Sequence, residues 1–178
     1  MGRGLYIGRF QPFHNGHYMV IKDLLKNEDE VIVCVAASQL SYTLSNPFSS
    51  GERIEMILRS LKDLRNRVIV LPSPNMESNS LWVETIIDTF PSFEKIYTNN
   101  NLVRLLWEKR GYKTSEVRFY QKDELNGTSI RKRISMGQEW TNLVPPETKK
   151  YIQEINGENR IKEILKIEEK LREGTLWF

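Results

Sequence analysis

The chain has 178 residues, of which 39% are hydrophobic and 28% are charged, with a formal net charge of +3 and one cysteine. This length suits one domain of ordinary size, and the balance of apolar and charged residues argues against general disorder. No apolar run approaches the ~20 residues of a membrane span, and no signal-peptide layout is visible. Because Cys34 is the one cysteine of the chain, the sequence excludes an internal disulfide framework and a cysteine-based zinc site. We therefore expect a single domain over residues 1–178, located in a reducing cytoplasm.

The first 120 residues alternate between strand and helix patterns. Residues 31–37 are a continuous β-branched run, as expected for a strand that is buried on both faces of a sheet. Strands separated by single helices form βαβ units and therefore a parallel sheet. The sequence thus predicts an α/β, Rossmann-like, doubly wound parallel sheet of about five strands, with helices on both faces and ligands at the carboxyl ends of the strands. The predicted strands are 5–7, 31–37, 68–71, 95–98 and 117–120, and the predicted helices are 18–25, 50–61, 80–90 and 102–110.

The C-terminal part, from about residue 126 to residue 172, is predicted to be mostly helical. Helices are expected at 129–136, 146–155 and 158–171, and the last has apolar residues at helical spacing between charged ones. We interpret this last segment as an amphipathic helix packed on the domain, and the alternative is a contact within an oligomer. Its apolar residues are Ile161, Ile164, Leu165, Ile167 and Leu171.

The loop after the first predicted strand, GRFQPFHNGH, carries the strongest functional signal. It follows a strand and opens a helix, which is where a parallel α/β protein binds phosphate. Both histidines of the chain, His14 and His17, lie here and face the same side of the first helical turn. Gly8 should allow a sharp turn, Gly16 a close approach of the ligand, and Arg9 adds a permanent cation. Together these residues suit a triphosphate.

Other interpretations of this loop are weaker. A lone histidine usually caps or packs, but two within one turn beside Gly and Arg at a strand end indicate a site. A metal site lacks a third ligand at suitable spacing nearby. The loop is neither a Walker motif nor the dinucleotide motif G-x-G-x-x-G, because Gly2-x-Gly4 precedes the strand.

A second phosphate-binding element is expected at residues 126–131, NGTSIR. A Thr or Ser at a helix start, followed by Arg one turn later, can hold phosphate oxygens with N–H, hydroxyl and guanidinium donors. The two stretches together resemble the H-x-G-H and S-x-T-x-x-R signatures of the nucleotidyltransferase superfamily, which contains the adenylyl- and cytidylyltransferases. Asn126 takes the place of the first Ser. Arg131 is the functional candidate, whereas Lys132 and Arg133 stay ambiguous.

Four further stretches resemble the archaeal nicotinamide mononucleotide (NMN) adenylyltransferases, and the chain is identified as a member of that family from about Leu5 to about Gly157. The resemblance implies that Asn79 and Trp82 bind NMN. A tryptophan offers a flat face to the cationic nicotinamide ring, and an asparagine can bond ribose hydroxyls. Position alone would favour a tryptophan in the core. The stretches are residues 38–53, 79–83, 111–112 and 143–145.

Three other positions depart from the family pattern. Tyr42 stands where a His is usual, and Asn75 stands where an Asp is frequent. Asn99 stands where a Gly usually precedes Asn100, and an asparagine tolerates the left-handed backbone conformation better than most residues. None of these three positions lies in the two phosphate motifs.

The resemblance implies transfer of AMP from ATP to NMN, which gives NAD and pyrophosphate. The nucleophile is a phosphate oxygen that is already ionised at pH 7, so positioning and cationic donors matter more than a general base. The predicted catalytic residues are His14, His17, Arg9 and Arg131, and Mg²⁺ should bridge the triphosphate through water and phosphate ligands, without a protein metal site. The predicted ATP-binding residues are Gly8, Arg9, Phe10, His14, Gly16, His17, Asn100, Thr128, Ser129 and Arg131.

Two rival functions are considered. Another adenylyl- or cytidylyltransferase of the superfamily would keep both phosphate motifs but would not need Asn79 and Trp82 together. A nucleic-acid-binding module would use residues 131–133, but the low net charge and the lack of a basic, aromatic-rich stripe argue against it. The family further implies a homo-oligomer, often a hexamer, with ATP, NMN and NAD as partners and with neither nucleic acid nor membrane.

Overall fold

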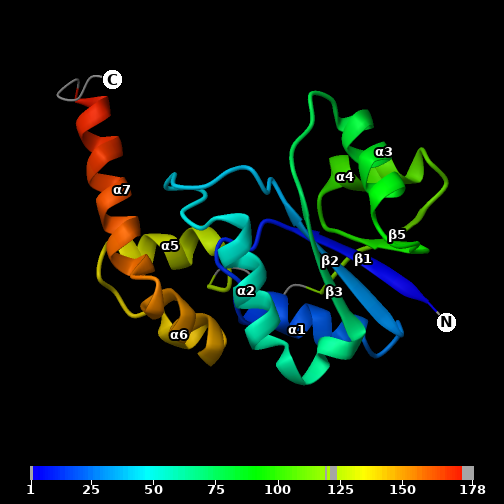
Figure 1. Cartoon of the computed structure of the whole chain (residues 1–178), viewed down its shortest axis with the longest axis horizontal. Coiled ribbons are helices and arrows are strands. Elements are labelled where there is room, and N and C mark those ends of the chain that lie inside the picture. Colours follow the sequence, from blue (N-terminus) through cyan, green and yellow to red (C-terminus); the bar gives the residue numbers. More distant parts are fainter. Residues whose placement is uncertain (1, 119, 121–123, 174–178) are drawn as a thin grey trace.

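The computed structural model describes residues 2–118, 120 and 124–173 (Figure 1). Among these residues, five parallel strands form one sheet in the order β3-β2-β1-β4-β5. The chain starts at the centre of the sheet, builds outward to one edge and then returns to build the other edge. This is the predicted doubly wound α/β fold. The strands are β1 (Arg3–Gly8), β2 (Glu30–Ala36), β3 (Val68–Ser73), β4 (Lys95–Tyr97) and β5 (Lys113–Ser115).

Helices cover both faces of the sheet, as predicted. Alternate residues of β2 point to opposite faces, so Val31, Val33 and Val35 belong to one core, and Ile32 and Cys34 belong to the other. The first core packs under α1 (Asn15–Leu24) and α2 (Ser50–Ser60). The second packs under α3 (Asn79–Thr89) and α4 (Asn101–Glu108). A short 3₁₀ segment, Lys62–Arg67, joins α2 to β3.

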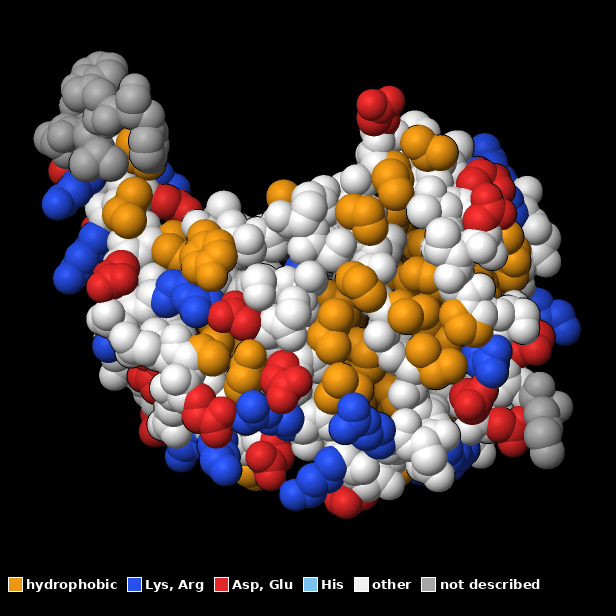
Figure 2. All heavy atoms as spheres, viewed as in Figure 1, with side chains coloured by type: hydrophobic (Ala, Val, Ile, Leu, Met, Phe, Trp, Pro, Cys, Tyr) orange, Lys and Arg blue, Asp and Glu red, His pale blue; other side chains and the backbone are white. Residues whose placement is uncertain are grey.

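The two strands at the edges of the sheet differ from the prediction, one in its end and the other in its position. The third strand continues through Pro72, which is tolerated because β3 is an edge strand. The prediction of a fifth strand at 117–120 was wrong for residues 117, 118 and 120, and residue 119 lies outside the described residues. The strand is the polar segment Lys113–Ser115, while Val117 and Tyr120 pack against the core below. In Figure 2, hydrophobic side chains gather on the surface beside α2 and over β3.

The C-terminal part is helical, as predicted, with α5 (Gly127–Ser135), a 3₁₀ turn at Thr141–Leu143, α6 (Pro146–Glu154) and α7 (Gly157–Arg172). The first half of α7 packs on the rest of the chain, because Ile161 and Ile164 are buried. Its last turns project outward, and Ile167 is 46% exposed (Figure 1). No helix in the described part of the chain is long and apolar enough to cross a membrane.

The projecting helix also holds the loop between β2 and α2. The Glu168 carboxylate accepts a hydrogen bond from the Leu44 N–H at 2.9 Å. The Arg160 guanidinium pairs with Glu52 at 2.7 Å and donates to the Pro47 carbonyl at 3.4 Å. The loop that follows β2 is therefore fixed from the C-terminal side of the chain.

Helix α5 begins in close contact with the loop that follows β1. A Cβ atom on Gly127 would lie 2.7 Å from the Gln11 carbonyl oxygen and 3.0 Å from Nη1 of Arg131. The same carbonyl accepts a hydrogen bond from Nη1 of Arg131 at 2.7 Å. A side chain at position 127 would therefore push α5 away from this loop.

We predict that Gly127→Ala lowers the free energy of unfolding by ~1–3 kcal/mol, because the added methyl group meets backbone that cannot move independently. Urea denaturation measures the change. Gly51→Ala is the matched control: it also adds a methyl near a helix N-terminus, but the nearest heavy atom, Oγ of Ser49, is 4.0 Å away. The control should be as stable as the wild type or slightly more stable. Equal stability of Gly127→Ala and Gly51→Ala would contradict the close packing of α5.

Candidate active site

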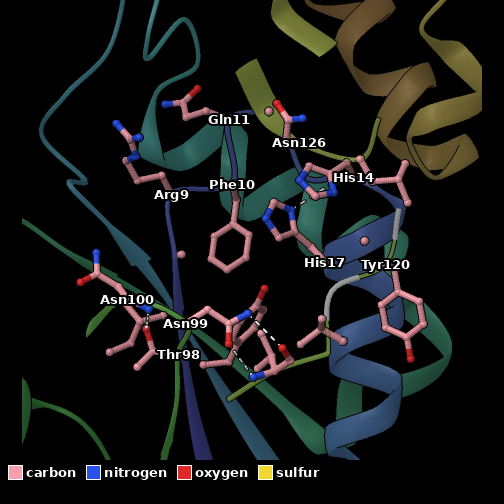
Figure 3. Close-up of a pocket in the computed structure, with 18 of the residues that line it drawn as sticks. Arg9, Phe10, Gln11, His14, His17, Thr98, Asn99, Asn100, Tyr120 and Asn126 are labelled. Atoms are coloured by element: carbon pink, nitrogen blue, oxygen red, sulfur yellow. Dashed lines mark hydrogen bonds between the residues drawn. The ribbon is translucent and has the colours of Figure 1, made fainter. Parts of the chain in front are cut away.

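A pocket of about 390 Å³ opens at the carboxyl ends of β1 and β4 (Figure 3). The loop after β1, the start of α1, the loop after β4 and the start of α5 contribute its walls. Three arginines line it, Arg9, Arg118 and Arg131, and no Asp or Glu is present among the described lining residues. A pocket with this charge favours an anionic ligand.

The two histidines stack on each other at this pocket, with ring centroids 3.6 Å apart and planes inclined by 23°. His17 lies between Phe13, on which it stacks at 5.7 Å, and Phe10, which it meets edge-on at 4.8 Å. The His14 backbone N–H donates to Nδ1 of His17 at 3.3 Å. This hydrogen bond assigns the proton of neutral His17 to Nε2, which makes Nε2–H a donor.

Burial keeps both imidazoles neutral. It lowers the pKa of His14 from 6.5 to about 4. It also lowers the pKa of His17 well below 6.5, and the adjacent His14 lowers it further. At pH 7 the pair therefore offers neutral N–H donors, and a bound anion would raise both pKa values. Gly16 leaves room for the His14 ring, since a Cβ there would lie 3.1 Å from it.

The turn that follows β1 is made by Phe10 and not by Gly8. Phe10 has a φ of 52°, whereas Gly8 has no positive φ. A Cβ on Gly8 would instead lie 2.8 Å from the Phe10 ring. The expectation that Gly8 allows the turn was therefore wrong, and Gly8 provides space for the aromatic ring that lies under the pocket.

Arg131 is held in place by protein groups on three sides. Its Nε donates to the Leu44 carbonyl at 3.0 Å, Nη1 to the Gln11 carbonyl at 2.7 Å, and Nη2 to Oγ1 of Thr128 at 3.3 Å. Burial, with a smaller contribution from Arg9, lowers the pKa of Arg131 to about 10, so it remains a cation at neutral pH. A guanidinium has five N–H donors, so three bonds leave donors for a ligand.

The other residues of the second motif have different roles. Asn126 caps α5, because its Oδ1 accepts the Ser129 N–H at 2.8 Å. Thr128 lines the pocket, as does Asn126. Ser129 does not; it lines a separate surface hollow beside Lys132 and Arg133.

The loop after β4 is fixed by asparagine side chains. The Asn99 amide pairs in both directions with the backbone of Val117, at 2.9 Å each. Asn100 caps α4 by accepting the Val103 N–H at 3.1 Å, and both asparagines line the pocket. Neither has a positive φ, so the loop does not use the tolerance of Asn99 for the left-handed conformation.

The structure places the two predicted NMN residues outside this pocket. Asn79 is exposed at the start of α3, and Trp82 is half-buried one turn later. The Trp82 indole N–H donates to Oγ of Ser73 at 2.9 Å, and the ring meets Trp107 edge-on at 6.5 Å. Both therefore lie near the carboxyl end of β3, two strands away from β1.

Two positions that depart from the family pattern also lie outside the pocket. Tyr42 is 61% exposed, and its ring lies 5.1 Å from the Arg160 guanidinium. The Asn75 backbone N–H donates to Oε1 of Gln39 at 3.0 Å. Neither side chain contributes to the arginine-lined pocket.

Sequence reasoning gave no role to two residues that support the pocket. The Gln11 amide pairs with the Phe48 backbone at 2.8 and 3.1 Å, which joins the loop after β1 to the start of α2. Arg53 is fully buried on α2. It occupies the same helix face as the buried Met56 and Ile57. A charged residue on an otherwise apolar helix face is the sequence pattern that could have indicated its role.

The described lining of the pocket suits a metal ion that arrives with a phosphate ligand. The described residues contain no cluster of three His, Cys, Asp or Glu that could hold a metal ion. The amide oxygen of Asn99 is engaged by Val117, and that of Asn100 is engaged by Val103. A divalent cation would therefore take its ligands from phosphate oxygens and water.

The fold and this pocket define an α/β protein with an arginine-lined pocket at the carboxyl ends of its strands. The chain matches the cytidylyltransferase-like family over residues 5–133. It is 43% identical over 162 residues to a nicotinamide-nucleotide adenylyltransferase from Methanococcus aeolicus, covering 91% of this chain and 94% of that protein. It is 42% identical over 168 residues to one from Saccharolobus solfataricus, covering 93% and 98%. The chain thus belongs to the cytidylyltransferase-like family and, within it, to the nicotinamide-nucleotide adenylyltransferases.

A solved structure shares the fold. It is a bifunctional NMN adenylyltransferase/ADP ribose pyrophosphatase from Francisella tularensis, in complex with AMP and a Mn ion, and the TM-score is 0.75 at 21% identity. The match covers 97% of this chain but only 55% of that protein, so the chain spans about half of its length.

We predict that the histidine pair makes the folded protein sensitive to mild acid. The pKa of His14 is about 4 in the folded state and 6.5 when unperturbed, so the unfolded chain binds more protons between these values. The free energy of unfolding should be highest above pH 6.5 and fall as the pH drops, and the contribution of His14 to this fall should level off near pH 4. At 1.36 kcal/mol per pKa unit, His14 accounts for ~3 kcal/mol of this fall.

His14→Gln should make the slope of the profile between pH 6.5 and pH 4 shallower, as measured by urea denaturation at each pH, and the remaining slope should come from buried His17. Asn15→Ala, at the next position, removes no titratable group and should keep the wild-type slope. A His14→Gln profile parallel to that of the wild type would show that His14 titrates normally.

Proposed function

We propose that this protein transfers the AMP part of ATP to NMN, forming NAD and pyrophosphate. The observation that carries the proposal is the pocket itself: stacked neutral histidines and a fixed arginine meet at the carboxyl end of β1, without a carboxylate among the described lining residues. Such a site attracts and orients a triphosphate. The membership in the nicotinamide-nucleotide adenylyltransferases supports NMN as the acceptor.

In the proposed reaction, a phosphate oxygen of NMN attacks the α-phosphorus of ATP. A P–O bond to NMN forms, the P–O bond to pyrophosphate breaks, and pyrophosphate leaves with the electron pair. No proton has to be removed from the nucleophile, because the NMN phosphate is already ionised. The protein lowers the barrier by bringing two anions together and by stabilising the charge that grows on the leaving group.

The pocket residues that the sequence predicted each have a proposed part in this step. Nε2–H of His17 and the ring of His14 donate to phosphate oxygens, and Arg131 and Arg9 hold the phosphates from two sides. Thr128 and the backbone of Gly8 and Phe10 complete the cradle, beside Gly16, and Asn100 lies where it can reach the adenosine ribose. We leave Ser129 out of this set, because its N–H is engaged by Asn126 and it does not line the pocket.

We propose Mg²⁺ as the divalent ion. When bound to the triphosphate it supplies charge neutralisation on pyrophosphate. The residues above would hold the phosphate oxygens, and the ion would take water and phosphate ligands. Among the described lining residues, the charged and amide side chains offer imidazole, amide and guanidinium groups and no carboxylate.

NMN is proposed to bind beside the ATP pocket, over the ends of β2 and β3. Trp82 and Asn79 lie at that end of the sheet. The Trp82 indole is anchored by Ser73, which leaves a ring face as a platform for the nicotinamide. The single-domain boundaries, the cytoplasmic location and the homo-oligomeric assembly stay predictions of the sequence.

The proposal is tested by incubating the protein with ATP, Mg²⁺ and NMN and separating the products. We expect NAD and pyrophosphate in equal amounts. His17→Ala should lower the rate by ~10²–10³, the usual cost of one lost donor to developing charge. Met19→Ala, on the same helix and 41% exposed in the wild type, is the control and should retain full activity. Absence of NAD, with nucleotide transfer to another phosphorylated acceptor instead, would support the rival within the superfamily.

A further inference from the structure

The guanidinium of Arg53 is completely buried and is surrounded by backbone carbonyls. None of the ion pairs formed by the described residues includes it. Burial, with a smaller contribution from Arg9, lowers its pKa to about 10, so it is still a cation at neutral pH. The five acceptors are the carbonyls of Arg9 at 2.9 Å, Ala36 at 2.9 Å, Ala37 at 3.1 Å, Ser38 at 3.4 Å and Ser49 at 3.2 Å.

Four of these carbonyls come from the carboxyl ends of two adjacent strands, β1 and β2. Each end contains a non-glycine residue in the left-handed region: Phe10 with a φ of 52° and Ala37 with a φ of 50°. Such residues persist only where the surrounding structure holds them in place. Arg53 contacts the peptide carbonyl before Phe10 and the carbonyls before and after Ala37. One side chain therefore holds both turns.

The contact to Arg9 also orients a donor in the pocket. The Arg9–Phe10 peptide bond is trans, so its N–H points opposite to its carbonyl. Because the carbonyl points at Arg53, the Phe10 N–H points to the other side of the loop. Arg9 and Phe10 line the pocket, and Arg53 does not. Arg53 thus fixes the peptide that forms the wall of the proposed phosphate site.

The contacts to β2 lead toward the other proposed substrate. The Ser38 N–H donates to the Ser73 carbonyl at 3.1 Å, and Oγ of Ser73 accepts the Trp82 indole N–H at 2.9 Å. The carbonyls of Ala37 and Ser38, which flank that N–H, both accept from Arg53. The two proposed substrate sites therefore share one rigid connection.

We infer that Arg53 is a positioning residue that sets the distance between the ATP pocket and the neighbouring site over the ends of β2 and β3. This inference rests on the proposed function, in which NMN occupies the second site. Misplacement of two reactants by ~1 Å can cost ~10² in rate. Loss of the Arg53 contacts therefore lowers kcat more than it weakens the binding of either substrate alone. An arginine that only filled the core would change stability and leave kcat per folded molecule unchanged.

Arg53→Lys and Arg53→Met test the inference. Lysine keeps the charge but has three donors at a single point instead of a planar group with five, so it cannot reach both strand ends at once. Methionine keeps a similar length without charge or donors. Arg59→Lys is the matched control on the same helix, because Arg59 lies at the surface and pairs with Glu55 and Glu154. The measurements are kcat, KM for ATP and KM for NMN well below the unfolding temperature, together with urea denaturation.

We expect Arg53→Lys to fold, with kcat reduced ~10–100-fold and each KM changed less than ~5-fold. Arg53→Met should lose at least as much of kcat, and Arg59→Lys should match the wild type. A kcat of Arg53→Lys within twofold of the wild type would overturn the inference. Failure of Arg53→Lys to fold would also overturn it, because Arg53 would then be required for the fold itself. A wild type that makes no NAD would instead contradict the proposed function.

Discussion

Hydrogen bonds from buried and partly buried side chains to backbone carbonyls hold the functional end of this molecule together. The carboxyl ends of parallel strands leave loops whose backbone groups need partners. Here Arg53 binds the carbonyls after β1 and β2, Arg131 binds those of Gln11 and Leu44, and the Gln11 amide binds Phe48. A cation surrounded by carbonyls gains charge-assisted hydrogen bonds without bringing a negative side chain into the site.

This arrangement explains the electrostatic character of the pocket. Because carbonyls rather than carboxylates hold the arginines, the positive charge of Arg131 is not cancelled, while the adjacent histidines are neutral through burial. The neutral histidines thus add no repulsion to the positive charge of the arginines, and an anionic ligand can raise the pKa of His14 and His17 as it binds. Binding and proton uptake are coupled in such a site.

The sequence predicted the features that depend on local pattern. The alternation of strand and helix patterns predicted the parallel sheet, and the three-residue spacing of His14 and His17 predicted that they lie on the same side of the helix. The predictions from sequence were wrong where contacts between distant parts of the chain determine the local structure. The edge strand Lys113–Ser115 is polar and short, so hydrophobicity pointed instead to the segment that follows, in which Val117 and Tyr120 are partly buried against the core. The left-handed turn falls on Phe10 rather than Gly8, and Arg53, which lies 44 residues after Arg9, holds the Arg9 carbonyl in the peptide that precedes Phe10. No local signal marks that contact.

The central claim is that the two substrates occupy two adjacent sites at the carboxyl ends of the strands. Nuclear magnetic resonance of labelled protein tests it most directly. A non-hydrolysable ATP analogue with Mg²⁺ should shift the ring signals of His14 and His17 and leave the indole N–H of Trp82, assigned with Trp82→Phe, in place. Subsequent addition of NMN should then shift the Trp82 signal. If the analogue moved Trp82 and left both histidines unchanged, the triphosphate would not bind in the arginine-lined pocket and the account would be wrong.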